Sequence, residues 1–148
     1  DDKLNLARKT GAAETINTSK ESLHQRLLDL TNGLGPDVMI EAIGLPQTFR
    51  AAVEEVAFTG RVVYIGLAGS PSLIDTRLVA LKDVTAVGVL SASPGLAGTI
   101  ERYASGAVDP RPLIAATVGL DQVGDILAGA RPTSAGDGPK IHVDPRRF

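Results

Sequence analysis

The chain has 148 residues, 43% of them hydrophobic and 22% charged, which is the length and composition of one ordinary globular domain with a buried core. A formal net charge of -2 and an aromatic content of 3% give no basis for binding nucleic acid or an anionic membrane. The absence of cysteine excludes a disulfide scaffold, a cysteine-ligated zinc and a thiol nucleophile within these residues. No apolar run is long enough to predict a membrane span.

The first residues, Asp1 to Leu4, contain neither an initiator methionine nor the basic and apolar regions of a signal peptide. This start predicts a chain cut from something longer. The expected location is the cytoplasm.

Apolar residues spaced three or four positions apart predict five helices, around residues 4–10, 23–30, 49–57, 96–104 and 123–130. The first is followed by Gly11, which is typical of a helix C-terminus. In the third, Phe49, Ala52 and Val53 are followed by two more apolar residues on the same face, Val56 and Ala57.

Short strands are predicted around residues 15–17, 37–42, 61–66, 85–89 and 141–143. The run from Asp37 to Ala42 is mostly apolar, which is typical of a strand buried on both faces. The run from Arg61 to Gly66 is the clearest candidate for a parallel strand. Because strands and helices alternate, the sequence predicts an α/β fold with a doubly wound parallel sheet.

Three predicted strands end in a glycine-containing segment, at residues 41–44, 66–69 and 88–91. Open parallel sheets bind ligands beyond the carboxyl ends of their strands. Glycine at these exits would let a flat ligand approach the backbone, but it is equally expected where a strand turns tightly into a loop. Both interpretations stay open.

No phosphate-binding fingerprint follows a strand, because neither G-x-G-x-x-G nor a Walker-type loop is present. The stretch Gly95-Leu96-Ala97-Gly98 opens a predicted helix without the required spacing. It is either a helix start after a proline or a set of amides able to meet an anion.

Few side chains suggest acid-base chemistry. His24 and His142 have no carboxylate placed to form a relay, so both are expected at the surface. Glu54 and Glu55 lie side by side on a helix and are interpreted as solvated charges. Glu41 ends an apolar strand, so it either caps nearby amides or faces the ligand crevice; the first is favoured because a buried carboxylate needs hydrogen-bond donors.

Three segments in order, residues 3–12, 35–66 and 138–145, resemble the medium-chain dehydrogenase/reductase family. The stretch from Val56 to Gly66 is most similar to polyol and sugar-acid dehydrogenases related to sorbitol and threonine dehydrogenases. The resemblance implies a partial Rossmann-type doubly wound parallel sheet that lacks its first strands and its glycine-rich turn. Residues 1–148 would then be a single, truncated coenzyme-binding domain with a C-terminal return segment.

The resemblance also implies cofactor-binding roles, one position at a time. It places a basic residue beside the adenosine ribose (Lys3), a strand end lining the crevice (Ala42, Ile43, Gly44) and a backbone segment holding the nicotinamide carboxamide (Ile65, Gly66, Leu67). Further backbone contacts to that amide are implied at Val89 and Ser91. Lys140 falls where many members reach the pyrophosphate, against the alternative of a solvated charge at the start of a strand.

The activity that the resemblance implies is that of a zinc-dependent alcohol or polyol dehydrogenase, in which zinc acts as a Lewis acid on the alcohol and hydride passes to NAD or NADP. The family's zinc ligands, proton relay and ribose-binding acid are not found in this sequence, so no catalytic or metal-binding residue is predicted here. The chain is expected to supply the nicotinamide-side wall, to bind NAD(H) weakly or not at all, and to oxidise nothing alone.

Other functions remain open. A zinc-free quinone or enoyl reductase shares this half of the fold. A methyltransferase-like domain would need a glycine-rich loop near its start and a final antiparallel hairpin, and neither is visible. A non-catalytic module could keep the sheet for self-association, because the resemblance implies a homodimer or tetramer through the strand around Thr85–Val89.

Overall fold

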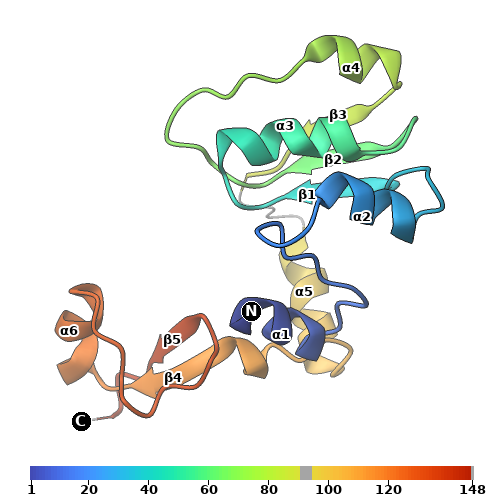
Figure 1. Ribbon diagram of the computed structural model, residues 1–148. Coiled ribbons are helices and arrows are strands. Elements are labelled where there is room, and N and C mark those ends of the chain that lie inside the picture. Colours follow the sequence, from blue (N-terminus) through green and yellow to red (C-terminus); the bar gives the residue numbers. More distant parts are fainter. Residues whose placement is uncertain (91–94, 148) are drawn as a thin grey trace. The chain divides into compact units, whose positions relative to one another are not determined.

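The computed structural model describes residues 1–90 and 95–147 (Figure 1). The chain divides into two compact units, and each is treated by itself below. The central unit comprises Thr18–Pro94, and the terminal unit comprises Asp1–Asn17 together with Gly95–Phe148.

The central unit alternates helices and strands. Its elements are α2 (Leu23–Leu30), β1 (Val38–Glu41), α3 (Pro46–Glu55), β2 (Arg61–Tyr64), α4 (Thr76–Leu81) and β3 (Thr85–Gly88). The strands form a parallel sheet in the order β1-β2-β3. Glu41 is paired with Tyr64, and Tyr64 with Gly88, so the carboxyl ends of all three strands lie along one edge.

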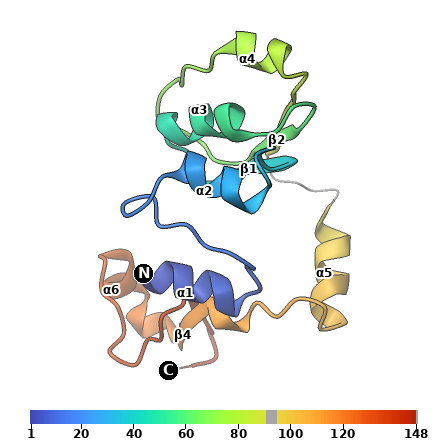
Figure 2. The same cartoon turned by 45° about the vertical axis from the view of Figure 1, so that its right-hand side comes forward.

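Helix α3 packs on one face of this sheet and supplies most of the core (Figures 1 and 2). Ala52, Val53 and Val56 from the helix and its end meet Val62 of β2 and Val84 before β3, and all five side chains are buried. The predicted apolar stripe of this helix is therefore confirmed, and it explains why the helix forms here: the stripe removes apolar area from water against the strands.

The opposite face of β1 is open. Val38 is 52% exposed and Ile40 62% exposed, whereas Met39 and Glu41 point to the α3 side. The prediction that this strand is buried on both faces is wrong within this chain, because alternate side chains of a strand point to opposite faces and only one face is covered by a helix of the central unit.

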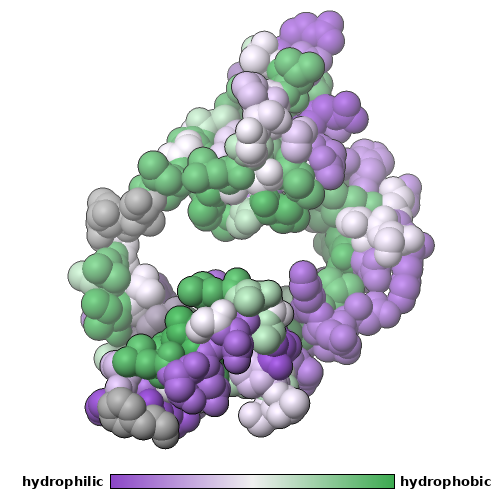
Figure 3. Space-filling model, turned by 90° about the vertical axis from the view of Figure 1, so that its left-hand side faces the viewer, coloured by the Kyte–Doolittle hydropathy of each residue, from purple (hydrophilic) through white to green (hydrophobic). Residues whose placement is uncertain are grey.

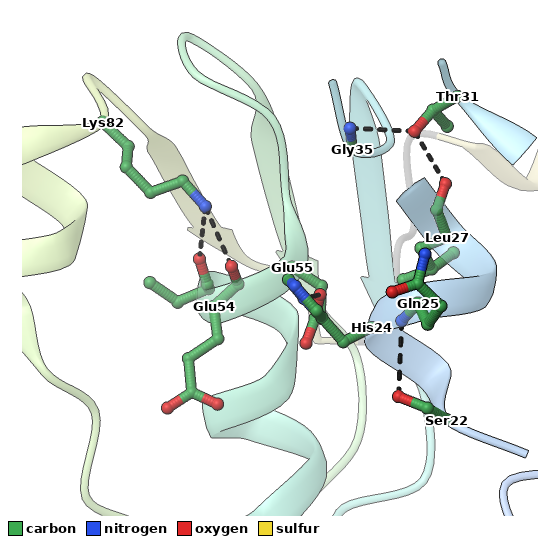
Figure 4. Close-up of polar contacts among 10 residues, drawn as sticks. Ser22, His24, Gln25, Leu27, Thr31, Gly35, Glu54, Glu55 and Lys82 are labelled. Carbon is green, nitrogen blue, oxygen red and sulfur yellow. Dashed lines mark hydrogen bonds and ion pairs between the residues drawn. The ribbon is translucent and has the colours of Figure 1, made fainter. Parts of the chain in front are cut away.

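Two polar contacts link α3 to its neighbours (Figure 4). Lys82 Nζ donates hydrogen bonds to the carbonyl oxygens of Glu54 (2.9 Å) and Val53 (3.4 Å), which satisfies acceptors at the open C-terminal end of the helix. His24 Nδ1 lies 2.8 Å from Glu55 Oε2, joining α2 to α3. His24 is exposed as predicted, but it has a carboxylate partner 31 residues away, and Glu55 is not a free solvated charge.

The terminal unit contains a second parallel pair of strands. Its elements are α1 (Asp2–Lys9), α5 (Leu96–Ala104), the 3-10 turn η2 (Arg111–Leu113), β4 (Ile114–Val118), the 3-10 turn η3 (Leu120–Gln122), α6 (Val123–Leu127) and β5 (Lys140–Val143). Strand β4 pairs with β5 in parallel, with a shift of register between Ile114 and Ala116. Helix α1 contacts the η2 turn at the start of β4 (Figure 2).

The expectation of a partial parallel α/β sheet is confirmed, with its strands divided between two separate sheets. The strand predicted at residues 15–17 does not form. Strand β4 and helix α4 were not predicted. No helix of the part of the chain that the structure describes is long and apolar enough to cross a membrane.

Candidate functional site

The exits of β1 and β2 touch each other at the carboxyl edge of the central sheet. Gly44 has a backbone φ of +81°, and a Cβ atom there would lie 2.6 Å from the carbonyl oxygen of Leu67. A Cβ atom on Gly66 would collide with the Glu41 carboxylate and with the backbone of Gly44. These two glycines are therefore required because the two exits approach each other closely, which supports the tight-turn interpretation at both positions.

Beyond this contact the edge is open. A Cβ atom on Gly69 or Gly88 would meet nothing within 4 Å. Aliphatic side chains stand exposed at the exits of β1 and β2: Ile43 is 69% exposed, Ile65 47% and Leu67 78%. Hydrophobic side chains also reach the surface elsewhere on the molecule (Figure 3), so it is their position at this edge that matters.

Glu41 is the buried acid of this edge, with 4% of its surface exposed. Its Oε1 atom accepts hydrogen bonds from the amides of Ile43 (2.9 Å) and Gly44 (2.8 Å) and from the hydroxyl of Thr48 (2.6 Å). Its Oε2 atom is buried and has no hydrogen-bond partner among the described residues. The structural role favoured for Glu41 is confirmed, because its carboxylate ties the loop after β1 to the first turn of α3.

The environment of Glu41 keeps it ionised at neutral pH. Burial raises the pKa of its carboxyl group, but the hydrogen bonds from the Thr48 hydroxyl and from the amides of Gly44 and Ile43 lower it by more. The net pKa lies below the ordinary value of 4.5. The edge therefore contains a fixed, buried negative charge.

Tyr64 and Phe49 form the aromatic side of the same edge. Their ring centroids lie 5.3 Å apart at an interplanar angle of 39°, and the Tyr64 hydroxyl donates to the carbonyl oxygen of Phe49 at 3.2 Å. Burial, and then the negative charge of Glu41, raise the pKa of Tyr64. Phe49 also lines a groove of about 460 Å³ together with residues 66–72 of the loop after β2.

The third strand exit is anchored to the second. Val89, half-buried, follows β3 and donates its amide hydrogen to the carbonyl oxygen of Tyr64 at 2.9 Å. Ala42 is exposed between Glu41 and Ile43. Ser91 lies outside the described residues. The predicted residues of the central unit thus lie at one edge: Ala42, Ile43, Gly44, Ile65, Gly66 and Leu67. Val89 is hydrogen-bonded to the end of β2 at the same edge.

The two predicted lysines belong to the terminal unit. Lys3 is exposed on α1 and lines a groove of about 860 Å³ with the start of that helix and the loop 135–139. Lys140 is exposed and begins β5 directly after that loop. Arg131 holds the loop by donating to the carbonyl oxygens of Gly136 and Gly138. Roles for both lysines in cofactor binding remain predictions.

Thr48 is the residue of this edge that sequence reasoning missed. It occupies the first turn of α3 after Pro46, and its hydroxyl contacts both Glu41 and the carbonyl oxygen of Leu45. The sequence did contain a signal for this contact: a residue with a hydroxyl group, Thr48, follows seven positions after the acid that ends the strand, Glu41. Among the described residues, no three His, Asp or Glu side chains are grouped so that they could hold a metal ion.

These features define a class of protein: an α/β fold with a parallel sheet whose strands end along one edge. The zinc-binding dehydrogenase family matches residues 1–105. The chain belongs to this family, as the later part of the coenzyme domain of a medium-chain dehydrogenase/reductase.

Individual relatives agree with this assignment. L-threonine 3-dehydrogenase of Colwellia psychrerythraea is 37% identical over 87 residues, which are 59% of this chain and 26% of that protein. The alcohol dehydrogenase of Thermus sp. ATN1 superposes with a TM-score of 0.79 at 27% identity, over 86% of this chain and 37% of that one. An alcohol dehydrogenase from E. coli CFT073, complexed with the cofactor NADH, shows the same fold (TM-score 0.77, 23% identity, 86% and 37% covered). The matched residues span about a quarter of the length of the curated relatives.

Proposed function

We propose that this chain supplies the nicotinamide-side wall of the NAD or NADP site in a zinc-dependent alcohol or polyol dehydrogenase. The bound nicotinamide would supply the ring carbon that accepts or donates hydride. The chain itself would bind and orient that ring and would be inactive alone. The zinc ligands would come from outside these 148 residues, which contain no cysteine and two histidines.

One observation carries the proposal: the touching exits of β1 and β2 present Ile43, Ile65 and Leu67 as an exposed aliphatic surface. An aromatic ring with one amide substituent fits such a surface, because its face is apolar and its edge needs only a few polar partners. The position of this surface at the carboxyl edge of a parallel sheet supports the same ligand. Val89 and Ser91 are proposed as further contacts to the amide.

The lysines are proposed to serve the other half of the cofactor. Lys3 would lie beside the adenosine ribose and Lys140 would meet the pyrophosphate. Both are exposed cations, and Lys3 borders an open groove. Phosphate binding by a lysine is a point-charge interaction, so it would weaken as salt increases.

An NMR titration of the 148-residue chain tests the proposal. Reduced nicotinamide mononucleotide at millimolar concentration is expected to shift the amide signals of residues 42–44 and 65–67, with a dissociation constant on the order of 1 mM. Of the two outcomes expected from the sequence, weak binding or none, we propose weak binding, so shifts elsewhere only, or none, would contradict the nicotinamide wall. Robust alcohol oxidation by a pure sample of this chain would contradict its proposed inactivity.

A zinc-free quinone or enoyl reductase is the alternative within the family. It would present the same wall, so the two are separated by metal analysis and by zinc-dependent turnover of the longest native form of the protein. Turnover that survives complete zinc removal would favour the reductase.

We also propose that the strand around Thr85–Val89 joins two copies of the chain, in a dimer or within a tetramer. Strand β3 is last in the sheet order, all four of its residues are exposed, and among the described residues it pairs only with β2. An unpaired strand edge is a template for association. A solution mass equal to one chain at every concentration would count against this pairing.

A further inference from the structure

Glu41 accepts hydrogen bonds from residues of the proposed nicotinamide surface with both its side chain and its main-chain carbonyl oxygen. Its side-chain Oε1 accepts from the amides of Ile43 and Gly44. Its main-chain carbonyl oxygen accepts from the amides of Ile65 (2.8 Å) and Gly66 (3.0 Å). A single residue therefore accepts hydrogen bonds from four main-chain amides, two from each strand exit.

This arrangement decides what the wall can offer a ligand. Since these four N–H groups are already donated to Glu41, they are not available to donate to a bound molecule. The two bonds to the main-chain carbonyl hold the exit after β2 against the end of β1, and the two bonds to Oε1 fold the loop after β1 around the carboxylate. The exits meet where Gly44 and Gly66 leave no room for a Cβ atom. The spacing of the exposed side chains of Ile43 and Ile65 follows from this closed contact.

The charge of Glu41 belongs to the arrangement as well. A carboxylate accepts stronger hydrogen bonds than a neutral amide oxygen, and burial increases the difference. Thr48 supplies the third donor to the same oxygen, at 2.6 Å. No lysine, arginine or histidine side chain is hydrogen-bonded to Glu41 in the part of the chain that the structure describes, so its negative charge is held by dipoles.

We propose that Glu41 is a positioning residue for nicotinamide binding. Its buried carboxylate fixes the loop after β1, and its main-chain carbonyl holds the exit of β2 beside that loop, at the separation the ring requires. Glu41 contacts no ligand itself in this role and acts through Ile43 and Ile65. The proposal rests on the proposed function, since it assumes that the nicotinamide ring lies on this edge.

The test compares Glu41→Gln with the wild-type chain by two measurements on each sample: amide hydrogen exchange, and NMR titration with reduced nicotinamide mononucleotide. Glutamine keeps the size and the main-chain carbonyl of Glu41 but removes the charge. Exchange at Ile43 and Gly44 is expected to become about tenfold faster, and mononucleotide binding about tenfold weaker. Exchange at Ile65 and Gly66 should rise less, because their acceptor remains.

Three further variants separate positioning from simple stability. Thr48→Val removes one donor and should weaken mononucleotide binding about threefold, while Thr48→Ser, which keeps the hydroxyl, should restore it. Glu54→Gln, an exposed acid on the same helix, should change neither measurement. Val53→Ala loosens the whole core, so it should speed amide exchange across the central unit, with no particular increase at Ile43 and Gly44.

The outcomes are distinct. Unchanged mononucleotide affinity in Glu41→Gln, with faster exchange at Ile43 and Gly44, would overturn the positioning role and leave the nicotinamide wall intact. A loss of affinity no larger than that of Val53→Ala at equal loss of stability would also overturn it. Absence of any shift at residues 42–44 and 65–67 in the wild-type chain would overturn the proposed function, and the positioning role with it. If Glu41→Gln does not fold, the contrast between Thr48→Val and Thr48→Ser decides.

Discussion

The two units use the same parallel strand pairing but bury very different amounts of apolar side chain. In the central unit, Val53, Val56 and Val62 are no more than 1% exposed, and α3 covers the strands. In the described part of the terminal unit, Val118, at 5% exposure, is the one hydrophobic side chain that is buried. Strand pairing satisfies backbone hydrogen bonds in both units, whereas a stable core also needs a second layer.

In the terminal unit, two arginines donate hydrogen bonds to main-chain carbonyl oxygens. Arg147 donates to the carbonyl oxygen of Thr117 at 2.9 Å, and Arg131 donates to that of Gly138 at 2.9 Å. The Arg147 contact is exposed and the Arg131 contact is partly buried, and neither removes apolar side chains from water. The difference places the candidate nicotinamide edge on the more firmly packed unit, where a binding surface can keep its shape.

The largest effect is expected from Gly66→Ala in the central unit. The added methyl group would collide with the backbone of Gly44, which cannot move without opening the contact between the strand exits, so unfolding free energy should fall by about 3 kcal/mol. Gly69→Ala is the matched control, since its Cβ would meet open space, and it should stay within about 0.5 kcal/mol of wild type. Urea unfolding measures both, and equal losses would contradict the close approach.

Core truncation compares the units directly. Val53→Ala should cost the central unit about 2 kcal/mol, because the cavity is enclosed on all sides. Val118→Ala should cost the terminal unit about 1 kcal/mol, since fewer buried neighbours surround it. Amide signals resolved for each unit during urea unfolding give the two values, and a larger loss for Val118→Ala would reverse the comparison.

Acid should weaken the central unit through Glu41. Because its pKa in the folded chain lies below the ordinary value of 4.5, the stabilisation is fully present above about pH 4.5 and is lost as the pH falls through the folded pKa. Urea unfolding at several pH values between 7 and 3 measures this loss. Glu41→Gln should lack this part of the pH dependence, and an identical pH profile in the variant would show that Glu41 is not its source.

The smallest effect is expected from His24→Ala. The pair with Glu55 lies at the surface, where the histidine is 62% exposed, so unfolding free energy should change by less than about 1 kcal/mol. Thermal unfolding in low and high salt measures the change. A loss comparable to that of Val53→Ala would show that the contact between α2 and α3 carries more of the fold than its exposure suggests.

Much of the central unit could be predicted from the sequence because its elements carry strong local patterns. The apolar residues of α3 recur at the spacing of a helix, and β2 forms from a short, mostly apolar run typical of a buried strand. Strand β4 was missed because Ile114–Val118 follows a proline-rich turn and contains small residues that favour no single structure. The exposed face of β1 could not be predicted, since an apolar run does not say whether a helix covers both of its faces.

The candidate edge was predictable only in outline. Parallel strands place their carboxyl ends together, so residues 42–44 and 65–67 could be expected at one edge. The four amides that Glu41 occupies depend on the register between β1 and β2 and on the φ of Gly44, neither of which a sequence pattern specifies. The partnership of His24 with Glu55 was missed for a similar reason, because it joins two helices across 31 residues.

Lys82, described above at the end of α3, has a consequence for the order of assembly. Its ammonium group satisfies the carbonyl oxygens of Val53 and Glu54, and its own carbonyl oxygen accepts the amide of Thr59 at 2.7 Å. The helix end and the turn into β2 therefore both depend on a residue more than twenty positions downstream. During synthesis, α3 can begin to form early. Its C-terminal turn gains the hydrogen bonds from Lys82 only after the chain through Lys82 has been made and the segment between α3 and Lys82 has folded back.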